Sequence, residues 1–179
     1  MQLKNHSAIL PVLLAVITSC ADQGEEPLSF KPQTIELAAN TLQLVNVTGV
    51  QSNSKFVLID QNGGVIHDEL NGHELIIPAA AVEAPTWFTM STLAVDKVVV
   101  ELVAYRAEDF APVTRFPKDL TLRLSITNAQ VSSPDRLKIV YVSASQLSIL
   151  EVFHTVISES GVHVEARIDH FSNYSMAMD

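Results

Sequence analysis

The amino-acid sequence predicts an all-β fold, an antiparallel β-sandwich, from three observations. Residues 120–126 and 162–169 alternate between apolar and polar side chains, so one face of each segment is buried and the other is wet. Turn-forming residues such as Asn62-Gly63-Gly64 and Asn71-Gly72 separate these and other short apolar segments. No segment shows a sustained helical period with capping residues. Short strands with one wet face favour antiparallel over parallel sheets.

The alternation also assigns faces. In residues 120–126 the apolar set that includes Leu122 faces the core, and Thr121 lies on the wet face. In residues 162–169 the apolar set includes Val164, and the polar set begins with His163 and Glu165. Less regular segments of the same kind predict further strands at 56–60, 73–77, 87–91, 97–105, 136–143, 149–155 and 171–178.

The composition fits one folded domain. The chain has 179 residues, of which 47% are hydrophobic and 17% charged, enough for one substantial core. Its formal net charge is -9, from 11 Lys and Arg against 20 Asp and Glu. A negative protein repels phosphate backbones, so we expect no nucleic-acid partner.

The N-terminus has the pattern of a targeting segment. Lys4 supplies a positive start, and residues 8–18 form an apolar run shorter than the roughly 20 residues that span a bilayer. The run ends in Ile17-Thr18-Ser19-Cys20, which resembles the lipobox of bacterial lipoproteins. In that family the chain is cut before the cysteine and the cysteine is acylated. The resemblance therefore implies a signal peptide over residues 1–19 and a lipid anchor on Cys20.

The alternative is an ordinary secretory signal that happens to contain a cysteine. Cys20 is the only cysteine in the chain, so it has no internal disulfide partner, and lipidation accounts for it. Several acyl chains anchor a protein stably where one chain does not. Ala21 follows the cysteine, which resembles the pattern of lipoproteins sorted to the outer membrane. The expected location is thus the bacterial cell envelope, lipid-anchored at the outer membrane.

A flexible tether is expected between the anchor and the folded domain. Residues 21–33 are polar and acidic, and Pro27 and Pro32 interrupt them, so the tether is assigned to residues 20–41. The β-sandwich domain is then predicted to cover residues 42–179.

From about residue 56 the domain resembles a ZU-five domain, a module shared by zonula occludens proteins, netrin receptors, ankyrins and bacterial secreted proteins. The residues that carry the resemblance are 59–65 (IDQNGGV), 75–82 (LIIPAAAV), 84–86 (APT), Phe116-Pro117, Tyr141 and 170–175 (HFSNYS). It implies a β-sandwich with an adaptor-like role, and it does not imply spectrin binding. Two departures are Ala80, where the family usually has Gly, and Trp87, where a small apolar residue is common. A positive φ at Ala80 would be strained.

Two groups of side chains are candidate metal ligands. His67, Asp68, Glu69, His73 and Glu74 surround a predicted turn, and imidazoles with carboxylates can hold zinc. The alternative is a polar hairpin loop. His163 and Glu165 share one strand face, and the alternative there is a solvated sheet with cross-strand charge pairs. In both places the second interpretation is preferred, so no metal or cofactor is expected.

The tripeptide His170-Phe171-Ser172 is the remaining candidate for chemistry. Some ZU-five domains cut themselves between the Phe and the Ser of this tripeptide, and the resemblance implies that Ser172 Oγ would attack the Phe171 carbonyl with His170 as base. The alternative is structural: Phe171 packs inward, and His170 and Ser172 hydrogen-bond at the start of the last strand. We expect the structural role and an intact chain from Cys20 to Asp179.

Two further aromatic features bear on binding. Trp87, Phe88 and Met90 can form an exposed patch for a partner or belong to the core, and the core is expected. Tyr174 is expected to pack and hydrogen-bond. The sequence as a whole favours a lipid-anchored envelope protein with a non-catalytic binding or structural module and a protein partner. Self-cleavage and a metal-dependent binding module are the alternatives.

Overall fold

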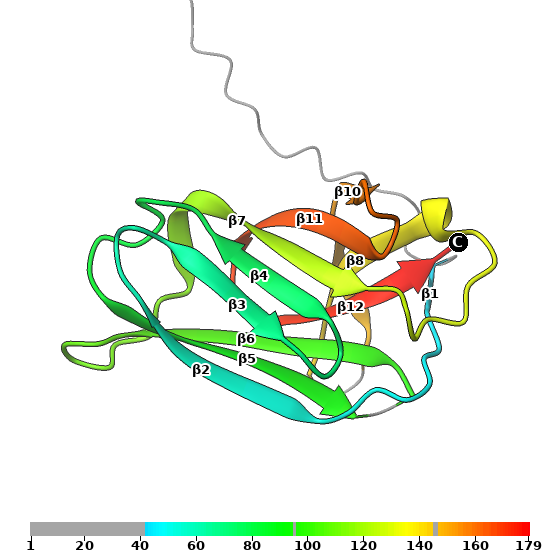
Figure 1. The fold of residues 1–179 in the computed structure, drawn as a ribbon, viewed down its shortest axis with the longest axis horizontal. Coiled ribbons are helices and arrows are strands. Elements are labelled where there is room, and N and C mark those ends of the chain that lie inside the picture. The colour runs from blue at the N-terminus through cyan, green and yellow to red at the C-terminus, as the bar shows by residue number, and fades with distance from the viewer. Residues whose placement is uncertain (1–41, 95, 145–146) are drawn as a thin grey trace, which may run out of the picture. The chain divides into compact units, whose positions relative to one another are not determined.

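The computed structural model describes residues 42–94, 96–144 and 147–179. The predicted signal peptide, Cys20 and the tether lie outside these residues. The described chain is all-β, and its strands form two antiparallel sheets, which confirms the predicted β-sandwich (Figure 1). A single 3-10 turn, Pro134–Arg136, precedes β8.

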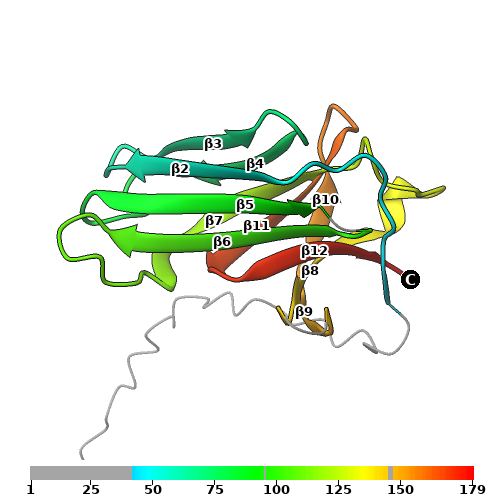
Figure 2. The ribbon, with the colours of Figure 1, turned by 90° about the horizontal axis from the view of Figure 1, so that it is seen from below.

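The first sheet has the strand order β2-β5-β6-β12-β8-β9, with β1 added beside β12. Figure 2 shows this sheet face on, with β2 at one edge and β8 and β9 at the other. The bounds of its strands are β1 Gln43–Leu44, β2 Asn53–Ile59, β5 Thr86–Ala94, β6 Val98–Arg106, β8 Leu137–Val142, β9 Ile149–Val152 and β12 Asn173–Met178.

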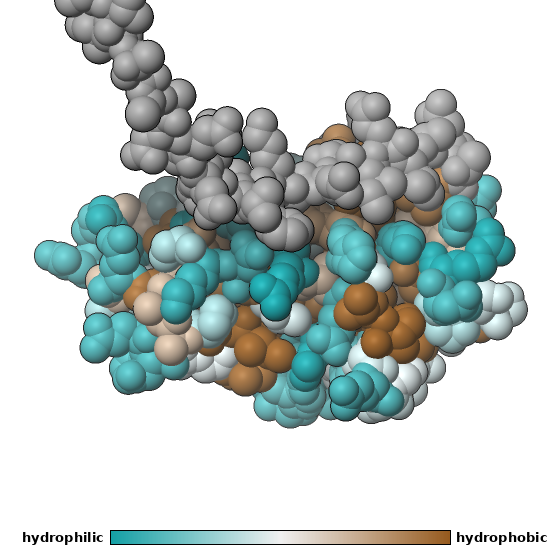
Figure 3. Space-filling view, turned by 90° about the horizontal axis from the view of Figure 1, so that it is seen from above, coloured by the Kyte–Doolittle hydropathy of each residue, from teal (hydrophilic) through white to brown (hydrophobic). Residues whose placement is uncertain are grey.

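The second sheet has the order β10-β11-β7-β4-β3. Its strands are β3 Gly64–Asp68, β4 His73–Ile77, β7 Arg115–Ser125, β10 Thr155–Ile157 and β11 His163–His170. Figure 3 looks onto the molecule from the side opposite to Figure 2, and polar groups alternate there with small apolar patches. A sheet with one face in a core and one in water gives this mixed surface.

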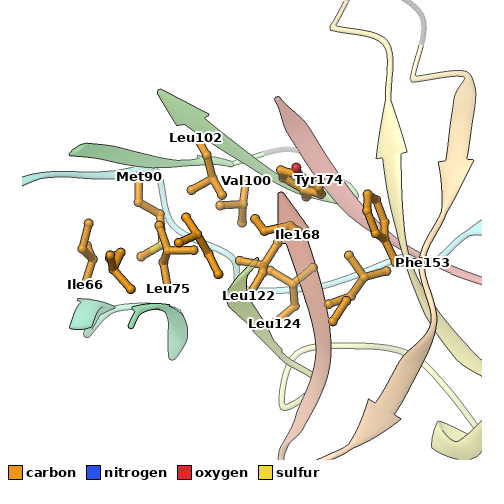
Figure 4. Packing of buried hydrophobic residues seen from close by; sticks show 14 of the residues in the cluster. Ile66, Leu75, Met90, Val100, Leu102, Leu122, Leu124, Phe153, Ile168 and Tyr174 are labelled. Atoms are coloured by element: carbon orange, nitrogen blue, oxygen red, sulfur yellow. The ribbon is translucent and has the colours of Figure 1, made fainter. Parts of the chain in front are cut away.

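The core lies between the two sheets. Leu120, Leu122 and Leu124 of β7 are each 0% exposed, whereas Thr121 and Arg123 on the other face are half-buried, as the alternation predicted. Figure 4 shows side chains from both sheets meeting in this layer, among them Leu122 and Tyr174. Apolar burial at roughly 25 cal/mol per Å² is the main source of stability for such a layer.

The bounds of most predicted strands shift by a few residues, and two predicted strands are divided or shortened where the chain changes sheets. The predicted strand 149–155 is two strands: β9 pairs with β8 in the first sheet, and β10 pairs with β11 in the second. The predicted strand 171–178 begins only at Asn173, since Phe171 and Ser172 connect β11 to β12 across the sandwich.

The first sheet is not wet over the whole of its outer face. A second apolar cluster consists of Leu42, Val140, Val142 and Ala177, and Leu44 and Ile149 among others pack against it. This cluster lies apart from the main core, so β8 and β12 bury residues on both faces. These two strands are exceptions to the pattern of one buried and one wet face that most strands of the sequence show.

Ala80, which stands where the ZU-five pattern usually has Gly, adopts the left-handed conformation that is strained for a residue with a Cβ. Its φ is 61°, and its N–H donates to the Gln61 carbonyl at 2.8 Å. This bond holds the 78–82 segment against the β2–β3 turn. The turn itself requires glycine, because a Cβ on Gly63 would lie 2.3 Å from the Ile77 carbonyl oxygen.

Candidate functional site

The five candidate metal ligands around the first hairpin do not converge. Strands β3 and β4 pair Asp68 with His73 and His67 with Glu74. Asp68 and His73 are each 1% exposed, whereas His67 is exposed on the other face, where its Nδ1 lies 3.3 Å from Glu74 Oε1. Glu69 lies in the turn and pairs with Lys55. Among the described residues no three such ligands come together.

Asp68 is instead the centre of a buried hydrogen-bond network. Its carboxylate accepts from Asn53 Nδ2 at 2.5 Å, from Thr92 Oγ1 at 2.6 Å and from Asn71 Nδ2 at 2.7 Å. Burial alone would raise the pKa of Asp68, but these hydrogen bonds together hold it below its usual value. The network ties β3 to β2 and β5, so it joins the two sheets.

His73 is a buried neutral imidazole beside this network. Its Nδ1 accepts from the Ser125 N–H at 3.0 Å, and its Nε2 is buried without a hydrogen-bond partner. Burial lowers the pKa of His73 to about 4, although the nearby Asp68 carboxylate opposes that shift. A buried group in this state contributes to stability only while it is uncharged.

His163 and Glu165 take separate partners. His163 Nε2 lies 2.8 Å from the Gly72 carbonyl oxygen. Glu165 lies directly across from Arg123, which in turn lies across from Glu74 on β4. Arg123 contacts both carboxylates at 3.2 Å, so the three charges form a cross-strand ladder on the outer face of the second sheet.

The tripeptide His170-Phe171-Ser172 lies where the chain passes from β11 to β12. His170 Nδ1 is 2.9 Å from Asp169 Oδ1, and its Nε2 is 3.7 Å from Glu151 Oε2. The hydrogen bond from His170 is the main reason that the pKa of Asp169 is lowered. Both ring nitrogens therefore face carboxylates, whereas a general base must direct a lone pair at its hydroxyl.

Phe171 and Ser172 have structural contacts. The Phe171 ring packs against Phe88 at 5.5 Å and Phe116 at 4.7 Å between centroids. The Ser172 carbonyl accepts the Leu102 N–H at 2.9 Å, and the His170 carbonyl accepts the Tyr174 hydroxyl at 2.5 Å. These contacts favour the structural interpretation of the tripeptide.

The predicted aromatic group at 87–90 divides between the two faces of β5. Phe88 and Met90 are buried in the core, as expected. Trp87 points outward and stacks on Phe56, with ring centroids 4.4 Å apart and planes at 6°. This exposed neighbour was not identified from the sequence, because Phe56 lies on a strand whose apolar residues occupy both faces.

Phe56 and Trp87 belong to a larger apolar surface, which we call the β2–β5 patch: Phe56, Leu58, Trp87, Val103 and Tyr105. Phe56 is 58% exposed, and Leu58 and Tyr105 are also exposed. The residues are contiguous, because Leu58 lies across from Trp87, and Trp87 lies across from Tyr105. Exposed apolar patches of this kind mark interaction surfaces.

The loop after β6, the strand that contributes Val103 and Tyr105 to this surface, presents one more exposed aromatic side chain. Phe110, in the loop after β6, is 64% exposed and has a φ of 55°. Arg106 and Asp109 form a two-point ion pair, with atoms 3.1 and 2.6 Å apart, and the Phe110 N–H donates to the Arg106 carbonyl. A bulky residue keeps a positive φ only where its surroundings impose it.

No known protein-family profile matches this chain, and a comparison with curated proteins finds no significant match. Across the described residues no helix has the length and apolarity needed to cross a membrane.

Proposed function

We propose that this chain is a lipid-anchored bacterial cell-envelope protein whose sandwich is a non-catalytic, ZU-five-like module that binds another protein. The lipobox-like Ile17-Thr18-Ser19-Cys20 supports the anchor, and the order of motifs from residue 59 to residue 175 supports the module. The proposed location is the outer membrane.

The observation that carries the binding role is the β2–β5 patch. Its side chains are aromatic and aliphatic, and aromatic side chains are enriched in protein interfaces; they lie on three paired strands, β2, β5 and β6. The exposed position of Phe56 is unfavourable, because a side chain that is 58% exposed leaves apolar surface in contact with water. A partner that covers the patch would recover that free energy.

The contacts of the other candidates support structural roles. The ligands around the first hairpin lie on opposite faces of β3 and β4, and His170 faces two carboxylates. We therefore assign the Asp68 network to joining the sheets and the tripeptide to the passage between β11 and β12.

In-cell photo-crosslinking tests the binding role. A photoreactive phenylalanine analogue at position 56 should give a discrete adduct with an envelope protein, and Tyr105→Lys should abolish it. The same analogue at Val65, which is 57% exposed on the other sheet, is the matched control and should give no such adduct. Equal adducts from positions 56 and 65 would contradict the proposal.

A further inference from the structure

We propose that the partner is bound as an extended peptide that adds a strand to the free edge of β2. This inference rests on the proposed protein-binding function and specifies the form of the ligand. An added strand forms hydrogen bonds with the free main-chain groups of an edge strand. Side chains or pockets beside the edge then determine which peptide sequences bind.

The first step is the hydrogen bonding of β2. Among the described residues the main chain of β2 pairs with β5 alone, and the register runs unbroken from Asn53 across from Thr92 to Ile59 across from Thr86. In an antiparallel ladder every second residue of an edge strand points its N–H and C=O away from the sheet. The outer edge of β2 is therefore a row of main-chain donors and acceptors that another extended chain can match, although the Ser54 N–H also donates to Asn53 Oδ1 at 3.0 Å.

The second step is a comparison of strand lengths. Among the four strands that end the two strand orders of the described sandwich, β2 is the longest; the two-residue β1, which pairs only with β12, is shorter still than the others. β2 has seven residues, whereas β9 has four, β3 five and β10 three. β2 contains no proline and its register no bulge, and its one charged residue, Lys55, is paired with Glu69. Natural proteins protect edges by shortening, bulging or charging them. β2 has the least of these protections.

The third step is accessibility. On β5 the inward-facing Phe88 and Met90 are 0% and 1% exposed, but on β2 the inward-facing Lys55 and Val57 are only half-buried. The inner side of β2 is thus partly open to solvent at Lys55 and Val57, whereas Ile59 at its end is buried. On the outer side, Phe56 and Leu58 stand beside the edge, where alternate side chains of an added strand would contact them.

These observations define the ligand. It is a β-prone, uncharged or weakly basic peptide, because apolar side chains fit Phe56 and Leu58 and the chain carries a net charge of -9. It runs antiparallel to β2, the slightly more stable arrangement. A second copy of this chain is disfavoured, because two negative proteins repel each other.

The test uses the protein's own reporter. Trp87 is the single tryptophan, lies across from Leu58 and stacks on Phe56, so its fluorescence reports on the β2 edge. The probe is a short capped peptide that alternates valine and threonine between terminal lysines. The control peptide has the same sequence but N-methyl groups on its central valine and the following threonine, which interrupt both of its hydrogen-bonding edges.

The unmodified peptide should change Trp87 emission saturably and should slow amide hydrogen exchange in β2 but not in β9 or β10. The N-methylated peptide should bind more weakly by roughly tenfold or more, since it loses main-chain hydrogen bonds. Leu58→Lys should weaken binding similarly, and Val65→Lys, at a matched exposed position on β3, should leave it unchanged.

Equal binding of the two peptides, protection at another edge, or no binding would overturn strand addition. Those outcomes are separate from the crosslinking result. An adduct at position 56 without strand addition would leave the binding function standing with a different contact. Strand addition without any adduct would overturn the proposed function and leave the edge chemistry in place.

Discussion

Ala80 shows how one residue can be strained for the sake of a turn. Its left-handed conformation allows its N–H to reach the Gln61 carbonyl. We predict that Ala80→Gly raises the free energy of unfolding by about 0.5–1 kcal/mol, because relief of the Cβ clash outweighs the greater freedom of glycine in the unfolded chain. Urea denaturation measures the change. Ala79→Gly, whose φ is not positive, should lower stability instead, and a gain from both variants would contradict the explanation.

The buried imidazole of His73 makes stability depend on pH. Its pKa falls from 6.5 in the unfolded chain to about 4 in the folded protein. The unfolded state therefore binds the proton more tightly, so the contribution of His73 is complete above pH 6.5 and is lost as the pH falls toward 4. We predict a loss of about 2 kcal/mol between pH 7 and pH 5 from this group.

Urea denaturation at the two pH values, with His73→Asn, checks this prediction. Asparagine keeps an acceptor for the Ser125 N–H and cannot be protonated, so the variant should lose most of the pH dependence. His67→Asn, on the exposed face of β3, should keep it. An unchanged pH dependence in the His73 variant would show that another group is responsible.

Strand β7 provides a direct test of facing. Leu122 is 0% exposed, and its neighbour Thr121 lies on the outer face across from Ile76 and Arg167. Leu122→Asp buries an unpaired charge and should cost about 3–5 kcal/mol, or leave the protein unfolded. Thr121→Asp should be nearly neutral in thermal denaturation. Equal damage from the two variants would mean that the assigned facing is wrong.

Some strands of this protein can be predicted from the sequence and others cannot, for physical reasons. Strands β7 and β11 alternate cleanly because one face is buried and the other is wet. The sequence does not predict strand β3, because its inward residues are Ile66 and Asp68 and its outward residues include Val65, so hydropathy does not follow burial. The sequence therefore predicts only that His67 and Asp68 lie beside a turn. The polarity of Asp68 is tolerated inside because Asn53, Thr92 and Asn71 donate to it.

The β2–β5 patch cannot be predicted from the sequence either, because its residues come from β2, β5 and β6 and only the order of these strands in the sheet brings them together. The same holds for the change of sheet between β9 and β10, which leaves no mark on residues 149–155 beyond a loss of regularity. Local pattern therefore predicted strands and their faces, and long-range pairing decided which surfaces they share.

Anchoring through Cys20 has a clear expected outcome for the full chain. Cys20→Ala removes the only candidate for lipidation, so the variant should stay uncleaved or be released, whereas the natural protein should fractionate with membranes until detergent is added. Membrane fractionation with intact mass of the product measures both effects. A variant that matures and fractionates like the natural protein would refute the lipobox interpretation.

The state of the Phe171–Ser172 bond is the second expectation for the full chain. Because His170 faces Asp169 and Glu151, we predict an uncut product from Cys20 to Asp179. Mass spectrometry after denaturation decides the matter, since denaturation would release a C-terminal strand that stayed paired in the sheet. A fragment beginning at Ser172 that disappears in Ser172→Ala would establish self-cleavage.

The pairing of β1 with β12 has a mechanical consequence. β1 joins the sheet through two residue pairs, Gln43 with Met178 and Leu44 with Ala177, and through the bond from the Val45 N–H to the Met176 carbonyl. Tension on the chain through residue 42 would load this short ladder first. β1 would then peel away while β12 stayed paired with β6 and β8. Under such tension β1 would detach before the rest of the sheet. Its release would lengthen the chain on the N-terminal side of β2 while the core stayed folded.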